Sequence, residues 1–221
     1  MVGISRKGAR KSSADTKHRY ILFHKPFGVL SKFRDSEGRP TLSDYITIPD
    51  VYSVGRLDKD SEGLLLLTSD GVFSHFLTSP SSKVPKTYWV QVERVPDESS
   101  LKQLREGVII QGKRTRPAQV TLLDREPHVF PRSVPIRYRK SVSTAWLNIA
   151  ISEGMNRQIR RMTAQVGHPT LRLIRIGIGT LALGSLPVGH WRDLRKTELE
   201  ALGSSGARTQ PVLHPSLQKP E

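Results

Sequence analysis

A carboxylate flanked by cations lies inside the run VGRLDKDSEGLLLLTSDG, which covers residues 54–71. Asp58 stands between Arg56 and Lys59, and a glycine on either side permits the backbone to bend. A loop carboxylate held by a rigid strand is well placed for chemistry, as a nucleophile, a base or a metal ligand. The purely structural alternative is that Asp58 caps a turn or pairs with Arg56.

The carboxylates that alternate along this run do not have the pattern of a metal site. Asp58, Asp60 and Glu62 lack the glycine and the distant bidentate glutamate of a calcium loop. Cysteine is absent from the chain, and the histidines show no metal-ligand spacing. We therefore expect no metal, and we interpret Asp60 and Glu62 as solvated loop charges.

The elements that would position this loop are strands and helices in mixed order. A continuous apolar run at 64–68 predicts a strand buried on both faces, and Asp70 is expected to cap the helix that follows. The order is neither a regular alternation of strand and helix nor all strand, which predicts an α+β fold with helices flanking a mixed, mostly antiparallel sheet. Further strands are expected at 20–24, 87–93, 119–123, 144–151 and 171–176. Helices are expected at 97–106, at 156–166 and after a capping box formed by Thr197 and Glu200.

The two ends of the chain differ in composition from its body. Residues 1–18 are expected to form a disordered basic arm, and residues 203–221 a disordered tail. The ordered body is therefore expected at 19–202. Within it, a stretch rich in proline and arginine at 125–140 predicts a long loop or hairpin.

Charge is the strongest signal in the composition. Lysine and arginine number 35 against 20 aspartates and glutamates, a formal net charge of +15. Such an excess is typical of proteins that bind nucleic acid, and it favours this partner over a membrane surface. No apolar run is long enough to span a membrane, and the first residues lack the apolar segment of a secretory signal. We expect a cytoplasmic monomer with no membrane partner.

The run at 54–71 resembles the signature of the pseudouridine synthases, in which G-R-L-D is followed by a short variable stretch, G-L-L-L-L-T and D-G. Other segments that match in order are HKPFG at 24–28, KTY at 86–88, EGMNRQIRRM at 153–162 and a closing segment at 173–194. The resemblance is to the branch of the ribosomal small-subunit pseudouridine synthase A. Within it, the sub-branch of the large-subunit synthase E is most similar, because only a short basic arm precedes the first strand, where many relatives carry an S4-type domain. Ser61 stands where many relatives have threonine, which keeps the hydroxyl.

The resemblance implies a reaction and a role for each matching residue. Asp58 is implied to be the nucleophile that isomerises a uridine of ribosomal RNA, by preference 23S rRNA, without a cofactor. Tyr88 is implied to stack on the base and assist proton removal at C5, and Arg160 to form an ion pair with Asp58. Arg56 is implied to replace the flipped nucleotide. The implied fold is the pseudouridine synthase catalytic fold, with a central cleft that two subdomains can flank.

Other cations near these motifs are interpreted as contacts to RNA phosphates. Lys25 and Lys59 are expected to be such contacts. On a helical wheel of the helix expected at 156–166, Arg157 lies nearly opposite the core, whereas Arg160 and Arg161 lie on the two flanks. Either flank residue can reach a cleft, so the choice of Arg160 depends on the motif match. Arg157 and Arg161 are interpreted as a solvated basic face that contacts phosphate.

Two rival functions use the same residues differently. A non-catalytic RNA-binding or ribosome assembly protein accounts for the net charge of +15, but not for Asp58, Tyr88 and Arg160 occurring together in matching contexts. A carboxylate glycosidase acting on nucleic acid needs a second placed carboxylate, for which only Glu153 or Asp70 offers itself.

Overall fold

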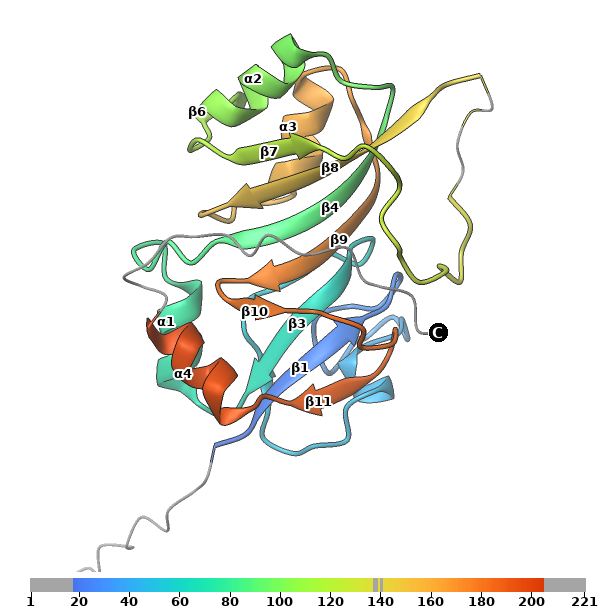
Figure 1. Cartoon of the computed structure of the whole chain (residues 1–221). Helices are drawn as coiled ribbons and strands as arrows, with labels where there is room; N and C mark the ends of the chain where they lie inside the picture. The colour runs from blue at the N-terminus through green and yellow to red at the C-terminus, as the bar shows by residue number, and fades with distance from the viewer. Residues whose placement is uncertain (1–17, 137–138, 140, 205–221) are drawn as a thin grey trace, which may run out of the picture.

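The computed structural model describes residues 18–136, 139 and 141–204 of the chain. The predicted basic arm, apart from His18, and the predicted tail, apart from Gly203 and Ser204, lie outside the described residues. The described body is an α+β fold in which helices pack on one large sheet (Figure 1), so the predicted fold class is confirmed.

One mixed sheet contains nine strands, and its pairings are antiparallel except at one place. The strands are β1 (Tyr20–Lys25), β2 (Tyr52–Ser53), β3 (Glu62–Thr68), β4 (Lys86–Glu93), β7 (Gln119–Leu122), β8 (Thr144–Ile151), β9 (Thr170–Ile178), β10 (Leu181–Ala182) and β11 (Trp191–Asp193). Their order is β11-β1-β3-β9-β4-β8-β7, with β2 beside β3 and β10 beside β9. A separate hairpin joins β5 (Ile109–Ile110) to β6 (Lys113–Arg114).

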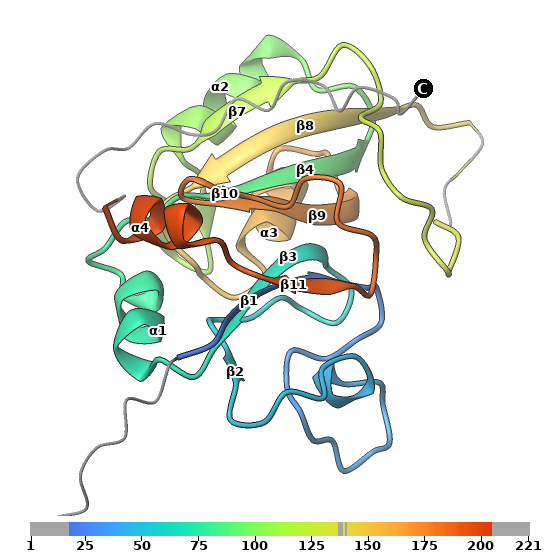
Figure 2. The same cartoon turned by 60° about the horizontal axis from the view of Figure 1, so that its bottom comes forward.

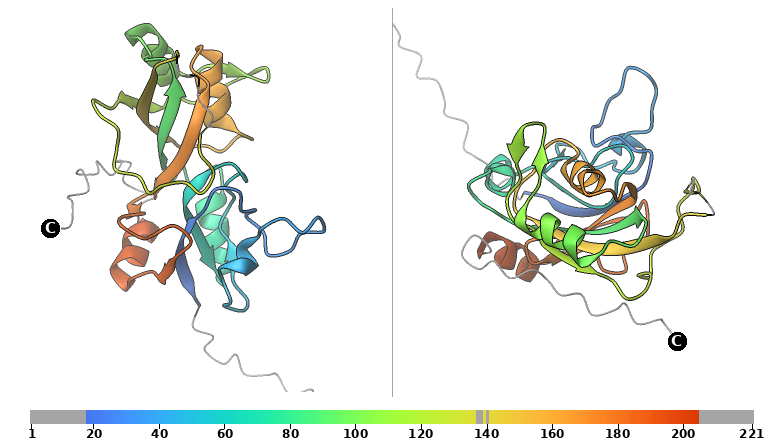
Figure 3. Two further views of the ribbon diagram at one scale, coloured as in Figure 1. Left: turned by 90° about the vertical axis from the view of Figure 1, so that its right-hand side faces the viewer. Right: turned by 90° about the horizontal axis from the view of Figure 1, so that it is seen from above.

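The sheet consists of two halves that meet at a short parallel contact between β3 and β9 (Figure 3). The paired residues there are Glu62 with Ile174 and Gly63 with Arg175. Gly63 has a φ of +103°, and a Cβ at this position would lie 2.3 Å from the carbonyl oxygen of Arg175. Only glycine tolerates both the backbone conformation and so close an approach, so Gly63 permits the two halves to join.

Helices cover both faces of the sheet: α1 (Gly71–Thr78), α2 (Glu98–Glu106), α3 (Gln158–Gln165), α4 (Lys196–Ser204) and a short 3-10 turn, η1 (Leu42–Asp44). Leu104 of α2 and Met162 of α3 pack in one core cluster. Leu77 of α1 and Leu202 of α4 pack in the other, and these two helices lie at the same edge of the molecule in two views (Figures 1 and 2).

The apolar run of β3 is buried on both faces, as predicted. Leu65 and Leu67 belong to one core cluster, whereas Leu64 and Leu66 belong to the other. This division follows from the alternation of side chains along a strand. Two buried faces hold β3 firmly, and the strand in turn anchors the loop that carries Asp58.

Two expectations about local structure are wrong. Glu62 is not a solvated loop charge but a buried residue of β3, where its carboxylate pairs with Arg172 of β9 at 2.7 Å. The last helix begins at Lys196, before the expected cap at Thr197; the main-chain nitrogen of Arg195 donates to Glu198 at 2.8 Å. The carboxylate that caps this helix is therefore not that of Glu200.

The stretch at 125–140 is a loop wherever the structure describes it, as predicted. No helix in the described part of the chain is long and apolar enough to cross a membrane.

Candidate active site

A cleft of about 640 Å³ opens where the two halves of the sheet meet. One half contributes the loop before β3, with Asp58. The other contributes Tyr88 of β4 and Arg157, which directly precedes α3. Three motifs that are far apart in the sequence thus line one cavity, and the predicted central cleft is present.

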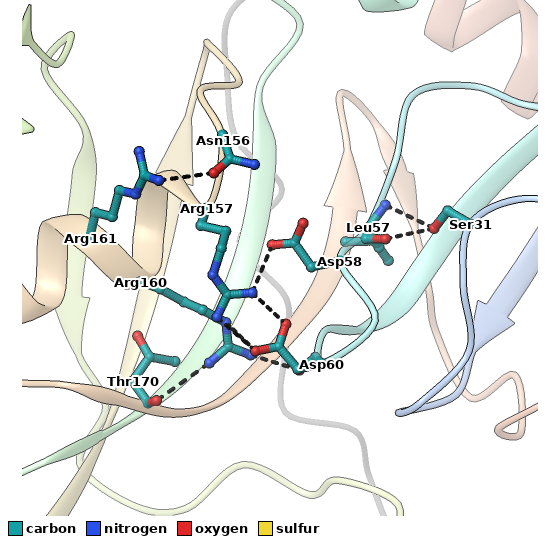
Figure 4. Close-up of polar contacts among 9 residues, drawn as sticks. All are labelled: Ser31, Leu57, Asp58, Asp60, Asn156, Arg157, Arg160, Arg161 and Thr170. Atoms are coloured by element: carbon teal, nitrogen blue, oxygen red, sulfur yellow. Dashed lines mark hydrogen bonds and ion pairs between the residues drawn. The ribbon is translucent and has the colours of Figure 1, made fainter. Parts of the chain in front are cut away.

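The backbone around Asp58 is fixed by hydrogen bonds on both sides, and Figure 4 shows those between Ser31 and Leu57 on one side. The hydroxyl of Ser31 donates to the carbonyl of Leu57 at 2.7 Å and accepts from its nitrogen at 3.1 Å. The nitrogen of Gly28 donates to the carbonyl of Lys59 at 2.8 Å. Asp58 also accepts a main-chain bond from Ser61 at 3.0 Å, while its side chain remains 36% exposed toward the cleft. Asp58 therefore has a fixed main chain and an accessible carboxylate.

Arg157, not Arg160, forms the ion pair with Asp58 (Figure 4). The distance from Nη1 of Arg157 to Oδ2 of Asp58 is 3.6 Å. The same guanidinium binds Asp60 through two hydrogen bonds, of 2.9 and 2.8 Å. The expected pairing of Arg160 with Asp58 is therefore wrong. Arg157 is exposed, as interpreted, but it also pairs with both carboxylates, and its contact with phosphate stays a prediction.

Arg160 binds Asp60 instead of Asp58. Its Nη2 donates to the main-chain oxygen of Asp60 at 2.6 Å, and its Nε lies 3.4 Å from Oδ2 of the same residue. Burial alone would raise the pKa of Asp60, but the hydrogen bonds from Arg157 and the charge of Arg160 outweigh it and lower that pKa below its ordinary value. Asp60 is thus an ionised anchor for both arginines.

Arg157 takes the place expected for Arg160 beside Asp58 because of where the helix begins. α3 starts at Gln158 rather than at Asn156, and Arg157 has a left-handed backbone with φ 51° and ψ 35°. A residue outside the helix does not follow the helical wheel, so the wheel misplaces Arg157. The side chain of Gln158 holds this helix start, accepting from Met155 at 2.9 Å and donating to Glu153 at 2.6 Å.

Tyr88 lies in the floor of the cleft and is also part of the core. It is 9% exposed and belongs to the same core cluster as Val90 and Val92, as the alternation along β4 predicts. It lines the cleft as well. The structural and the functional interpretation of this ring are therefore compatible.

Lys25 cannot contact a phosphate in this structure, which contradicts the expectation. Its side chain is 0% exposed, and Nζ donates to the carbonyls of Pro26 at 2.8 Å and Val29 at 2.7 Å. Burial lowers the pKa of Lys25 to about 7. Lys25 instead holds together the turn whose Gly28 nitrogen binds the Asp58 loop.

The other predicted RNA contacts differ in exposure. Arg56 and Lys59 are exposed, and Arg56 lines the cleft. Arg161 is half-buried and donates to Asn156 at 3.0 Å. Whether any of them binds RNA remains a prediction.

The sequence patterns did not single out several residues that line the cleft. Arg116 is exposed on its wall, and Lys86 lies two residues before Tyr88 on the same strand. Burial lowers the pKa of Lys86 to about 8. The alternation of β4 was a usable signal for Lys86, whereas nothing local points to Arg116.

The second carboxylate that a glycosidase would need is poorly placed. Asp70 caps α1, accepting from Phe73 at 2.9 Å and from the hydroxyl of Tyr20 at 2.7 Å. Glu153 lines the cleft, but its Oε1 accepts from the main chain of Arg116 at 2.8 Å and from Gln158. Both carboxylates have structural partners, which disfavours the glycosidase.

Comparison with known proteins decides the family. Residues 19–165 match the sequence model of the family described as RNA pseudouridylate synthase. The chain belongs to this family. Among curated relatives of this pseudouridylate synthase, the ribosomal large subunit pseudouridine synthase E of Vibrio parahaemolyticus is 50% identical over 188 residues, which are 85% of this chain and 79% of the relative. The protein of the same name from Xanthomonas campestris is 55% identical over 174 residues, 78% of this chain and 93% of the relative.

Solved structures of pseudouridylate synthases share the fold. A crystal structure of a pseudouridylate synthase matches with a TM-score of 0.71 and 32% identity, covering 84% of this chain and 74% of the other. A human protein, RNA pseudouridylate synthase domain containing 1, matches with a TM-score of 0.54 at 13% identity, and this likeness concerns the fold alone. The resemblance noted in the motifs is confirmed for the family and for the fold.

Proposed function

We propose that this pseudouridylate synthase converts a uridine of large-subunit ribosomal RNA to pseudouridine. The observation that carries the proposal is the accessible carboxylate of Asp58, beside Arg157 and in one cleft with Tyr88. Relatives 50% and 55% identical, over most of both chains, are named large-subunit synthases, and this supports the 23S molecule as the substrate.

Asp58 acts on the sugar of the target nucleotide in this proposal, by direct attack or by assisting a glycal intermediate. The bond between C1′ and N1 breaks, the base turns, and a bond forms between C1′ and C5. The proton on C5 leaves and N1 gains one, so substrate and product are isomers. No electron acceptor or group donor takes part, so this chain's own residues suffice for the reaction.

Arg157 and Tyr88 have supporting roles. The guanidinium of Arg157, held by two bonds to Asp60, orients the Asp58 carboxylate and balances its charge. The ring of Tyr88 offers a stacking surface for an unstacked base and takes part in proton removal at C5. Both roles require the target nucleotide to leave its helix, and Arg56 at the cleft is the proposed residue that fills the gap.

The net charge of +15 supports an RNA partner, with exposed Arg56, Lys59 and Arg116 as proposed phosphate contacts near the cleft. A monomer acting in the cytoplasm remains the expected form.

The test is to map pseudouridines in ribosomal RNA from a strain that lacks the gene, and then to restore the wild-type gene or the Asp58→Asn variant. We expect one large-subunit site to lose pseudouridine, to regain it with the wild type and not with the variant. A strain whose ribosomal pseudouridines are all retained would contradict the enzymatic proposal. RNA binding by the purified protein would then favour the non-catalytic alternative.

A further inference from the structure

Two buried polar groups that line the cleft have no partner in the described part of the chain. Arg175 is 5% exposed and Ser61 is 1% exposed, and both line the cleft. Nη2 of Arg175 and Oγ of Ser61 have no hydrogen-bond partner among the described residues. A buried donor or acceptor without a partner is unfavourable, so such groups often bind a ligand.

Arg175 is held in place by another of its nitrogens. Nε donates to the carbonyl of Leu64 at 2.7 Å, across the junction between β9 and β3. Arg172 on the same strand contrasts with it, because its guanidinium is satisfied by Glu62 and by the carbonyl of Phe130. No ion pair joins Arg175 to a carboxylate in the described residues, so its charge is available to a ligand.

Each group lies next to a residue of the proposed chemistry. Arg175 is directly opposite Tyr88 in the pairing of β9 with β4, so their side chains are neighbours on one face of the sheet. Ser61 belongs to the turn of Asp58, and its nitrogen donates to the Asp58 carbonyl at 3.0 Å. The two groups therefore come from opposite halves of the sheet to the same cavity.

The chemistry of the two groups is complementary to the edge of a uracil. That edge presents a carbonyl oxygen, an N3–H donor and a second carbonyl oxygen. A guanidinium only donates, whereas a serine hydroxyl can accept. Cytosine would place an amino group and an unprotonated nitrogen at two of these three positions, and its amino group would oppose a donor.

We propose that Arg175 donates from Nη2 to a carbonyl oxygen of the target uracil and that Ser61 accepts from N3–H of the same base. This proposal deepens the proposed function and rests on it. A backbone phosphate is a less favourable ligand for Arg175 and Ser61. A phosphate stays near solvent, and the exposed Arg56 and Arg116 of the same cleft suit it better.

The experiment uses a synthetic RNA hairpin that spans the mapped site, with uridine, 2-thiouridine or 4-thiouridine at the target. Sulfur is a weaker acceptor than oxygen, so for the wild type one thio substitution should lower kcat/KM by roughly tenfold. In Arg175→Met, kcat/KM on uridine should fall by a similar factor. The thio penalty, which is the ratio of kcat/KM on uridine to kcat/KM on the thiouridine, should shrink to within about twofold. Arg116→Met, the same substitution at the cleft wall, should weaken RNA binding but keep the full thio penalty.

Ser61 provides a second position to vary. Its substitution, unlike that of Arg175, removes no hydrogen bond between the described strands. Ser61→Ala should lower kcat/KM on uridine, with little change in Tm because the hydroxyl has no partner within the described residues. Ser61→Thr should restore the rate.

An equal thio penalty in the wild type and in Arg175→Met, or no penalty in either, would overturn the proposal. So would coupling of Arg175 to a phosphorothioate at the target nucleotide, since that would identify a phosphate. A wild-type protein that isomerises no uridine would contradict the proposed function itself, whereas an active wild type without coupling would overturn only this inference.

Discussion

Arg157 places one guanidinium between two carboxylates, with Nη1 3.6 Å from Oδ2 of Asp58 and two hydrogen bonds to Asp60. The bonds to Asp60, at 2.9 and 2.8 Å, are the shorter contacts, so Asp60 fixes the arginine. Arg160 in turn binds the main chain of Asp60 at 2.6 Å. Asp58 therefore receives its charge partner through an arrangement that does not depend on Asp58 itself.

Asp58→Asn should abolish pseudouridine formation while the fold and RNA binding persist. The amide keeps the shape of the side chain but cannot act as a nucleophile, so we expect a loss of kcat on the order of a thousandfold or more. Release of tritium from C5-labelled RNA measures the rate, and a melting curve checks the fold. Asp124→Asn, which removes the same charge from an exposed loop position, should leave the rate unchanged. Residual turnover near the wild-type rate would contradict the assigned role of Asp58.

Arg157→Met and Arg160→Met should have different effects. Arg157→Met removes the cation beside Asp58, and we expect kcat to fall by roughly tenfold to a hundredfold. Its effect on Tm should be small, because the side chain is 42% exposed. Arg160→Met removes a largely buried donor to the Asp60 main chain, so Tm should fall along with activity.

Rate and melting temperature measured on both variants separate the two arginines. If Arg157→Met were fully active and Arg160→Met inactive with an unchanged Tm, the pairing implied by the family resemblance would be the functional one.

Lys25 should make stability depend on pH in the alkaline range. Burial lowers its pKa in the folded protein to about 7 from 10.5, so the unfolded chain binds the extra proton between these values. Stability should therefore rise with pH from about 7 to about 10, and the destabilising effect of Lys25 should be fully present below pH 7. The difference in Tm between the wild type and Lys25→Met, followed over this range, isolates the effect. Lys59→Met serves as the exposed control, and a pH-independent difference for Lys25→Met would refute the prediction.

Gly63→Ala should destabilise the junction between the halves of the sheet. The added Cβ would lie 2.3 Å from the carbonyl oxygen of Arg175, at a φ of +103°. We expect a loss of more than about 2 kcal/mol in the free energy of unfolding, because the contact is with backbone and cannot be relieved by a side-chain movement. Gly38→Ala is the matched control: φ is also positive, at +67°, but nothing lies within 4 Å. Its loss should be only about 1 kcal/mol, and equal losses measured by denaturant unfolding would show that the close approach is unimportant.

Local sequence determined the elements that hold the site. The continuous apolar run of β3 predicted a strand buried on both faces. The alternation of Tyr88, Val90 and Val92 predicted a strand with these three on one face, and both predictions are confirmed. The sequence also determined the family, because the motif around Asp58 and several other family motifs occur in the chain in the family's order.

Tertiary structure alone decided which charges meet. Arg157 rather than Arg160 pairs with Asp58 because the helix begins one residue after Arg157. The choice of Arg160 followed from the motif match, and the wheel treated Arg157 as a helical residue that faces away from the core. Lys25 and Glu62 were expected to face solvent as charged residues, yet both are buried where β1, β3 and β9 come together. Periodicity describes how one element faces its surroundings, whereas an ion pair depends on where two elements cross, and that crossing is set by contacts such as Gly63 against Arg175.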